Sequence, residues 1–202
     1  MVWPSSPRTS PGAACSVRTE PQVSTIPEPV GRELRVLVAV QRRLAGRPGA
    51  LGAARGLSHF GEHSLGWAAA AGVGMALDRS RRGEWGTVAV GAVGAHAVSI
   101  ALKRVVRRPR PNHPSVAVHV STPSRLSFPS SHASSTAAAA FLMSGIAGWP
   151  LVPLLVPPML LSRLLLGVHY PTDVVAGALL GVGCAASLRA AQDRYGLGGG
   201  HR

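Results

Sequence analysis

Five apolar stretches, separated by polar links, constrain the fold of this chain more than any other feature of its sequence. They cover residues 64–77, 85–102, 133–149, 150–166 and 174–190. A helix that crosses a bilayer needs about 20 apolar residues, with a range of about 17–25. Four of the stretches come close to that length, and the first is shorter and rich in alanine and glycine. We therefore expect an all-α membrane bundle of about five transmembrane helices.

Small residues and overall composition favour the same fold. Glycines recur at three- and four-residue spacings inside the apolar stretches, as at Gly91 and Gly94 or at Gly177 and Gly181. Small residues let helices approach closely in lipid, whereas each glycine weakens a soluble helix by about 1 kcal/mol. Hydrophobic residues make up 46% of the chain and charged residues 14%, and the mean hydropathy is +0.21. A membrane bundle explains this composition better than a soluble one.

The segments around the apolar stretches suggest four parts. Residues 1–30 are rich in proline, serine and threonine, and we expect a disordered leader. Residues 31–56 contain a basic amphipathic helix near 31–45, followed by a link. Such a helix can lie in the headgroup region of an anionic leaflet, and the alternative is a helix packed on a partner domain. Residues 57–192 would form the membrane-embedded domain, and residues 193–202 a flexible tail.

The charge balance bears on partners. The chain has 21 Lys and Arg against 8 Asp and Glu, a net charge of +13. Such a balance suggests nucleic acid or an anionic membrane surface. Aromatic residues are only 4% of the chain, too few to stack on bases, and the arginines lie between apolar stretches. We expect the lipid bilayer as a partner and no nucleic acid; a basic nucleic-acid-binding protein is the weaker alternative.

Three short motifs carry the chemistry. The first runs from Lys103, the only lysine, to Arg110-Pro111; the second is Pro-Ser-Ser-His132; the third runs from Ser162-Arg163 through His169 to Asp173. Arginine binds phosphate oxygens in pairs and lysine acts as a point charge. Histidine can act as a nucleophile or as an acid and base. With five spans, the 103–131 loop and the 167–173 turn lie on one side of the membrane, where the motifs can form a phosphate-ester site.

The three motifs resemble the signatures of the type-2 phosphatidic acid phosphatase family, K-x6-R-P, P-S-G-H and S-R-x5-H-x3-D. The spacing matches within each motif, and only Ser131, where the family has glycine, departs. The resemblance covers about residues 60–190. It implies that His169 attacks phosphorus and carries a phosphohistidine intermediate, and that Asp173 orients it. His132 would protonate the leaving oxygen and then activate water.

The resemblance also implies a phosphate clamp, formed by Lys103, Arg110 and Arg163. Ser130 and Ser131 precede the apolar run from 133 and would offer the free N–H groups of a helix amino terminus. We expect neither a metal ion nor a cofactor. The order H-x-x-E-H at 59–63 can suggest zinc, but no further carboxylate ligand is evident.

Three further stretches, at 57–63, 103–113 and 122–129, resemble a small actinobacterial branch of the family. That branch acts on decaprenylphosphoryl-5-phosphoribose, in a step toward the arabinose donor of the mycobacterial-type cell wall. The resemblance therefore implies metal-independent hydrolysis of this polyprenyl lipid phosphate. Undecaprenyl pyrophosphate, phosphatidylglycerophosphate and phosphatidate are alternatives of the same class. A catalytically silent lipid-phosphate binding protein is an alternative of another class.

The distribution of arginine predicts which side of the membrane the site faces. Arginines are more frequent in 32–55 and 104–108, on the side of the amino terminus, than at the opposite ends of the spans. Cytoplasmic loops carry an excess of positive charge. We therefore expect an integral protein of the cell (inner) membrane with its active site on the cytoplasmic face.

Overall fold

The structure, a computed structural model, describes residues 31–195, and its regular secondary structure within that range is helical. Its α-helices are α1 (Arg32–Leu44), α2 (Ala50–Phe60), α3 (Leu65–Leu77), α4 (Arg82–Val106), α5 (Ser131–Ala147), α6 (Val152–Leu165) and α7 (Pro171–Tyr195). Within 31–195 there is no β-strand, and a single bridge pairs Pro109 with Leu126. The all-α class is therefore confirmed. The predicted leader and the predicted tail from 196 onward lie outside the described residues.

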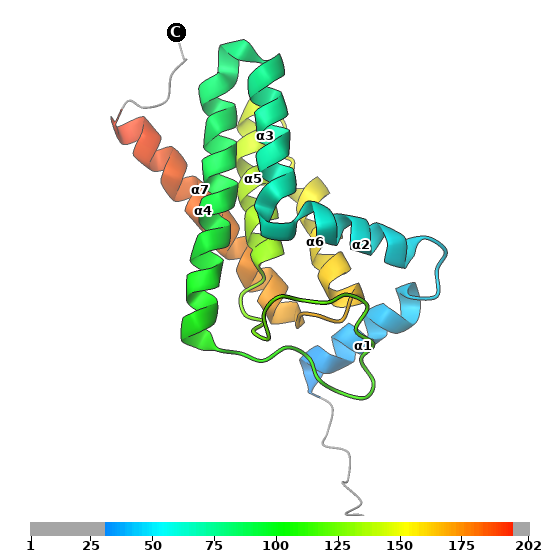
Figure 1. Cartoon of the computed structure of the whole chain (residues 1–202). Helices are drawn as coiled ribbons and strands as arrows, with labels where there is room; N and C mark the ends of the chain where they lie inside the picture. The colour runs from blue at the N-terminus through cyan, green and yellow to red at the C-terminus, as the bar shows by residue number, and fades with distance from the viewer. Residues whose placement is uncertain (1–30, 196–202) are drawn as a thin grey trace, which may run out of the picture.

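Helix α5 is the centre of the bundle and packs against α4, α6 and α7 (Figure 1). Small side chains make this packing possible, because almost every residue from 133 to 140 of α5 is buried alanine, serine or threonine. On α7, a Cβ added at Gly177 would lie 2.5 Å from the carbonyl oxygen of Ser130. Side chains larger than hydrogen would push α7 away from α5. The small residues thus act at helix contacts, as their spacing predicted.

Two described helical stretches are long and apolar enough to cross a bilayer, Arg79–Val106 and Pro171–Tyr195. Helix α6 is a shorter apolar helix of 14 residues, and α5 has 17. At 1.5 Å per residue, α5 is about 26 Å long and α6 about 21 Å, against a hydrocarbon core of about 30 Å. Two helices therefore meet the full length criterion, fewer than the five spans expected from the sequence.

Helix α1 forms where the amphipathic pattern predicted it, and it packs within the chain. Leu37 is fully buried, and the side chain of Gln41 donates to the carbonyl oxygens of Ala117 at 2.6 Å and Leu165 at 3.1 Å. The amide oxygen of Gln41 accepts from the N–H of Ala117 at 3.1 Å. One face of α1 is thus fixed to the 107–130 loop and to α6. Its arginines stay exposed.

The link expected after α1 contains a further helix, α2, and the predicted boundary between 56 and 57 falls inside it. Gly52 and Gly56 lower the intrinsic helix propensity of this segment. Packing supplies the missing stability, because Ala54 is buried in a cluster with Leu165 and Leu166. Differences elsewhere are small: α4 extends to Val106, beyond the start of the predicted loop, and residues 193–195 of the predicted tail are helical.

The 107–130 loop and the link between α6 and α7 lie at the same end of the bundle, beside α1 (Figure 1). The carboxyl end of α4 and the amino end of α5 open into that loop. Residues from four helices and two connections therefore meet at this end, which is where the three motifs lie.

Candidate active site

A cavity of about 410 Å³ lies where the three motifs meet. It is lined by six of the eight residues that the sequence singled out, namely Lys103, Arg110, Ser131, His132, Arg163 and His169. The other two, Ser130 and Asp173, are fully buried behind its wall. The structure therefore brings the predicted residues together from the ends of α4, α5, α6 and α7 and from both connections.

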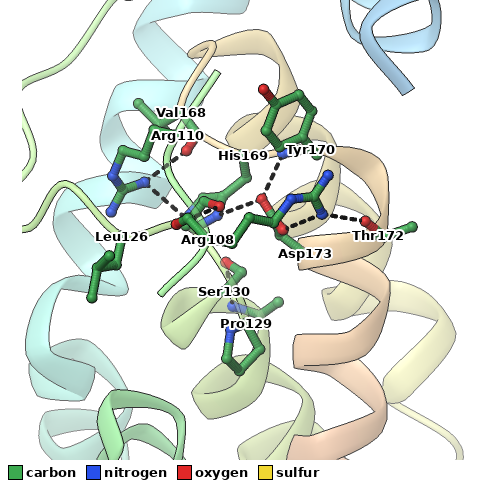
Figure 2. A network of polar contacts seen from close by, with 12 residues as sticks. Arg108, Arg110, Leu126, Pro129, Ser130, Val168, His169, Tyr170, Thr172 and Asp173 are labelled. Carbon is green, nitrogen blue, oxygen red and sulfur yellow. Dashed lines mark hydrogen bonds and ion pairs between the residues drawn. The ribbon is translucent and has the colours of Figure 1, made fainter. Parts of the chain in front are cut away.

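His169 is buried, and each of its ring nitrogens has a distinct neighbour. Its Nε2 lies 3.2 Å from Nη1 of Arg110 (Figure 2). A guanidinium can only donate hydrogen bonds, so Nε2 is the accepting nitrogen and the proton of the neutral ring is assigned to Nδ1. Nδ1 lies 3.6 Å from Oδ2 of Asp173, too far for a hydrogen bond. The lone pair of Nε2 therefore points toward Arg110 and accepts its hydrogen bond.

Asp173 is held by groups other than the histidine. Its Oδ1 accepts from Nη1 of Arg108 at 2.8 Å, and its Oδ2 accepts from the backbone N–H of Tyr170 at 2.8 Å (Figure 2). Its backbone oxygen accepts from the N–H of Ser130 at 2.9 Å. These bonds fix the carboxylate beside His169 and tie the amino end of α5 to that of α7. Because hydrogen bonds in unliganded sites are often long, this geometry is compatible with an orienting contact.

Burial and positive charge together set the protonation of the site. Burial lowers the pKa of His169 well below 6.5, and the cations Arg110, Lys103 and Arg163 lower it further. Burial also lowers the pKa of Arg110 to about 10, against an opposing effect of Asp173. At neutral pH the ring of His169 is therefore neutral while Arg110 keeps its charge.

The three cations of the predicted clamp are held by neutral groups. Nζ of Lys103 donates to the carbonyl oxygens of Ser127 and Pro129, at 3.0 and 2.6 Å. Arg110 donates to the carbonyl oxygens of Ser124 and Val168, at 2.8 and 2.7 Å. Arg163 is 2% exposed and donates from Nη1 to the hydroxyl of Ser58 at 3.0 Å.

Among residues 31–195, none of these three cations forms an ion pair with a carboxylate. A buried charge without a partner is costly, and an anion that reaches it is bound strongly. The cavity is therefore built to accept an anion with several oxygen atoms.

Ser130 and Ser131 begin α5. Ser130 is the N-cap residue, and its hydroxyl accepts from the N–H of Ala133 at 3.5 Å. The hydroxyl of Ser131, where the family pattern has glycine, lies 2.7 Å from the hydroxyl of Ser99 on α4. The extra side chain is therefore accommodated by a partner on the neighbouring helix.

Arg108 is a site residue that the sequence did not single out. It bonds Asp173, donates to the hydroxyl of Thr172 at 2.7 Å and forms an ion pair with Glu33 of α1. Its guanidinium carbon lies 4.2 Å from the ring centre of Tyr170. Several arginines fall inside the first motif, and nothing in the local sequence distinguishes the one that turns toward Asp173. Ser58 on α2 was missed for a similar reason, since it lies far from the motifs in the chain.

A helical bundle with apolar helices and a cationic cavity lined by both motif histidines, His132 and His169, defines a membrane protein with a phosphate-ester site. Residues 84–195 match the model of the PAP2 superfamily, and the chain belongs to this family. This membership confirms the resemblance drawn from the three motifs.

Curated relatives are more specific. The chain is 63% identical over 142 residues to decaprenylphosphoryl-5-phosphoribose phosphatase of Mycolicibacterium smegmatis, a match that covers 70% of this chain and 79% of the relative. It is 59% identical over 150 residues to the protein of the same name from Mycobacterium tuberculosis, covering 74% and 84%. Family and relatives together support a phosphoric monoester hydrolase.

Two solved structures share the fold. One is the first transmembrane PAP2-type phosphatidylglycerolphosphate phosphatase from Bacillus subtilis, with a TM-score of 0.63 and 21% identity, covering 79% of this chain and 86% of that one. The other is LpxE of Aquifex aeolicus, with a TM-score of 0.60 and 22% identity, covering 79% and 96%. These similarities support a membrane protein of the PAP2 fold.

Proposed function

We propose that this protein is a membrane-embedded phosphatase that removes the 5-phosphate of decaprenylphosphoryl-5-phosphoribose. The observation that carries the proposal is the cavity itself, which is lined by His169 and by three cations without carboxylate partners among the described residues. One of these cations, Arg110, contacts the accepting nitrogen of His169. The two mycobacterial relatives that bear this activity in their names support the choice of lipid.

The proposed reaction has two half-reactions. In the first, Nε2 of His169 attacks phosphorus, and a nitrogen–phosphorus bond forms as the bond to the ribose 5-oxygen breaks. His132, protonated on both ring nitrogens at this step, gives its Nδ1 proton to that leaving oxygen and becomes neutral. In the second, His132 takes a proton from water, whose oxygen displaces His169 and releases inorganic phosphate. The histidine is regenerated, and the proposed steps use only side chains of this chain and water.

The surrounding residues stabilise charge in each half-reaction. The cations of the cavity bind the equatorial oxygens of the phosphoryl group, where negative charge concentrates in the transition state. Asp173 orients His169 and stabilises the imidazolium that forms once Nε2 is bonded to phosphorus. The amino end of α5, at Ser130 and Ser131, adds a favourable helix dipole.

The wall of the cavity beyond the clamp fits the rest of the substrate. Among the described residues that line it, Glu62 is the one acidic side chain, and its carboxylate can accept hydrogen bonds from ribose hydroxyls, although it would repel phosphate. Arg104 lines the same cavity and suits the phosphodiester that joins ribose to the lipid. Ile100 and Leu126 offer apolar surface for the first part of the prenyl chain.

The competing lipids lack the ribose ring whose hydroxyls would donate hydrogen bonds to Glu62. Undecaprenyl pyrophosphate and phosphatidate have no ribose, and phosphatidylglycerophosphate carries a single glycerol hydroxyl in its place. A silent binding protein would need the clamp and would have no use for His169 and His132 in the same cavity.

The proposed topology has α3 to α7 as five spans, with α1 at the interface and the site at the cytoplasmic face of the cell membrane. Its support is the position of both motif-bearing connections and α1 at one end of the bundle, together with the exposed arginines of α1. The membrane-embedded domain would be residues 57–192. Labelling of single cysteines placed at Arg125 and at Ser80 in intact cells tests this: only the second should react with an impermeant thiol reagent.

The activity is tested on the purified full-length protein in detergent with four lipids, namely the phosphoribosyl decaprenyl lipid, undecaprenyl pyrophosphate, phosphatidylglycerophosphate and phosphatidate. We expect phosphate release mainly from the first, and loss of release in His169→Ala. Equal release by both proteins would favour the silent binder. A preference for another lipid would reject the substrate and leave the reaction type standing.

A further inference from the structure

The last turn of α2 lies against the candidate site, although it precedes residues 84–195, which match the family model. Ser58 in this turn is 8% exposed and lines the cavity. It belongs to the 57–63 stretch, one of those that resemble the actinobacterial branch. None of the proposed catalytic steps uses it.

The hydroxyl of Ser58 holds Arg163. The 3.0 Å bond from Nη1 to this hydroxyl is the one hydrogen bond that the Arg163 side chain makes within residues 31–195, and its Nε is buried without a partner among them. A guanidinium has five N–H donors in a rigid plane. A single acceptor at Nη1 therefore sets how that plane is turned and leaves the other donors for an anion.

The backbone of Ser58 holds His132. Nε2 of the ring lies 3.0 Å from the carbonyl oxygen of Ser58. A carbonyl oxygen only accepts, so Nε2 carries the proton, and Nδ1 is the nitrogen that can exchange a proton with a ligand. The same residue thus orients one phosphate-binding side chain and assigns the tautomer of the proposed acid–base group.

Gly61, at the end of the same turn, makes room for that ring. A Cβ at this position would lie 2.7 Å from Cδ2 of His132 and 3.2 Å from Cε of Met159. The φ angle of Gly61 is −80°, which any residue adopts. Space for the imidazole, and not backbone conformation, therefore requires glycine here.

We propose that Ser58 is a positioning residue, which aligns Arg163 through its hydroxyl and His132 through its carbonyl oxygen, with Gly61 keeping the ring in place. The inference rests on the proposed function, because that function assigns phosphate binding to Arg163 and proton transfer to His132. It adds to the family site an element that comes from α2.

The test compares Ser58→Ala and Ser58→Thr in the full-length protein, with Ser64→Ala as the matched control. Ser64 is also buried and lies in the short connection that follows α2, but it is outside the cavity lining and its hydroxyl faces the carbonyl oxygen of Ala92. Two quantities are measured: kcat/KM for the phosphoribosyl lipid across pH, and the dissociation constant for inorganic phosphate by equilibrium dialysis.

We expect Ser58→Ala to lower kcat/KM about tenfold to a hundredfold and to weaken phosphate binding about tenfold, because a buried charged donor loses its acceptor. The shape of the pH profile should not change, since the carbonyl that fixes His132 remains. Ser58→Thr should keep kcat/KM within about threefold, and Ser64→Ala within about twofold.

Gly61→Ala probes the other contact. The added methyl group should displace the ring of His132, lower kcat and alter the pH profile, while phosphate affinity changes by less than about threefold. A general loss of packing would instead lower kcat, weaken phosphate binding and lower thermal stability together. That result would count against the inference.

The outcomes separate this inference from the proposed function. Wild-type values of both quantities in Ser58→Ala, or equal losses in Ser58→Ala and Ser58→Thr, would overturn the positioning role and leave the enzyme activity intact. If the alanine variant does not fold, Ser58→Cys decides, because a thiol has similar size and is a poor acceptor. If the wild type hydrolyses no lipid, the function is rejected, while phosphate dialysis still decides whether Ser58 aligns Arg163.

Discussion

Arg108 donates a hydrogen bond to Asp173 across 65 positions of the chain, at 2.8 Å from nitrogen to carboxylate oxygen. The same guanidinium pairs with Glu33, so α1 is joined to the carboxylate beside His169. Burial alone would raise the pKa of Glu33, but hydrogen bonds from Thr172 and Arg108 outweigh it and lower that pKa. Glu33 of α1 is therefore connected through Arg108 to the carboxylate that lies beside the candidate nucleophile. Figure 2 shows the bonds of Arg108 to Thr172 and Asp173 in this network.

The network predicts the effect of removing its central cation. Arg108→Gln should lower kcat about tenfold and change KM little, because Asp173 loses the partner that holds it beside the histidine, while the phosphate clamp stays intact. Arg107→Gln is the matched control, since the neighbouring arginine is exposed. Steady-state kinetics with the phosphoribosyl lipid measures both. Equal kcat in the two variants would show that Arg108 is not needed to hold Asp173.

The lowered pKa of His169 predicts the pH dependence of the enzyme. Burial and positive neighbours disfavour the protonated ring, so protonation of His169 should lower kcat/KM only at pH values well below 6.5. Arg110→Gln removes one positive charge, which raises the pKa of His169 and moves the acid limb of kcat/KM upward. Arg110→Lys keeps the charge and should leave the limb in place.

Both Arg110 variants should also lose activity, about a hundredfold for glutamine, because the clamp is weakened. The comparison uses one substrate for all three proteins, so the titration of its own phosphate cancels. An acid limb at the same pH in the wild type and in Arg110→Gln would contradict the proposed electrostatic coupling.

Glu62 predicts discrimination between lipids. Glu62→Gln should raise KM for the phosphoribosyl lipid about threefold to tenfold, since a charged acceptor for the sugar hydroxyls becomes a neutral one. Hydrolysis of phosphatidate should stay equal or improve, because a negative charge leaves the cavity. Glu84→Gln serves as the control, because Glu84 lies in the first turn of α4, at the end of that helix away from the cavity. A parallel loss on both lipids would remove Glu62 from substrate recognition.

Lys103 predicts a strict requirement for a compact cation. Its side chain is buried, with the residue 7% exposed, and its ammonium group is bonded to two carbonyl oxygens, at 2.6 and 3.0 Å. A guanidinium is larger and planar, so Lys103→Arg should lower kcat/KM about tenfold or more although charge is conserved. The variant is compared with the wild type by kcat/KM and by thermal stability in detergent. Unchanged turnover would mean that any cation suffices here.

Ser131 predicts a small structural effect where the chain departs from the family pattern. Ser131→Gly should destabilise the protein by about 1 kcal/mol, because it removes the hydrogen bond with Ser99 and adds a flexible residue to the first turn of α5. Activity should stay within about threefold. Thermal unfolding in detergent measures the first effect, with Ser99→Ala as the companion variant. A large loss of activity would place the Ser131 hydroxyl in contact with substrate.

The sequence by itself determined the helical class, the extent of most helices and, among residues 31–195, five of the ten charged and histidine residues that line the cavity. Apolar stretches of nearly bilayer length, and motifs with fixed internal spacing, are local properties of the chain. The helices at 85–102, 133–149 and 174–190 therefore appear within a few residues of their predicted limits. Because these motifs resemble the family signatures, Lys103, His132 and His169 could be predicted to meet, and all three line the cavity.

Tertiary structure alone decided which other residues complete the site. Helix α2 contains two glycines and is stabilised by packing on α6, so its local sequence did not predict a helix. Nor did the local sequence predict that Ser58 lies beside Arg163. Arg108 lies among several arginines of equal local character, and only the path of the loop turns it toward Asp173. Hydrogen bonds between residues 65 to 105 positions apart depend on how helices pack, and packing is a property of the whole chain.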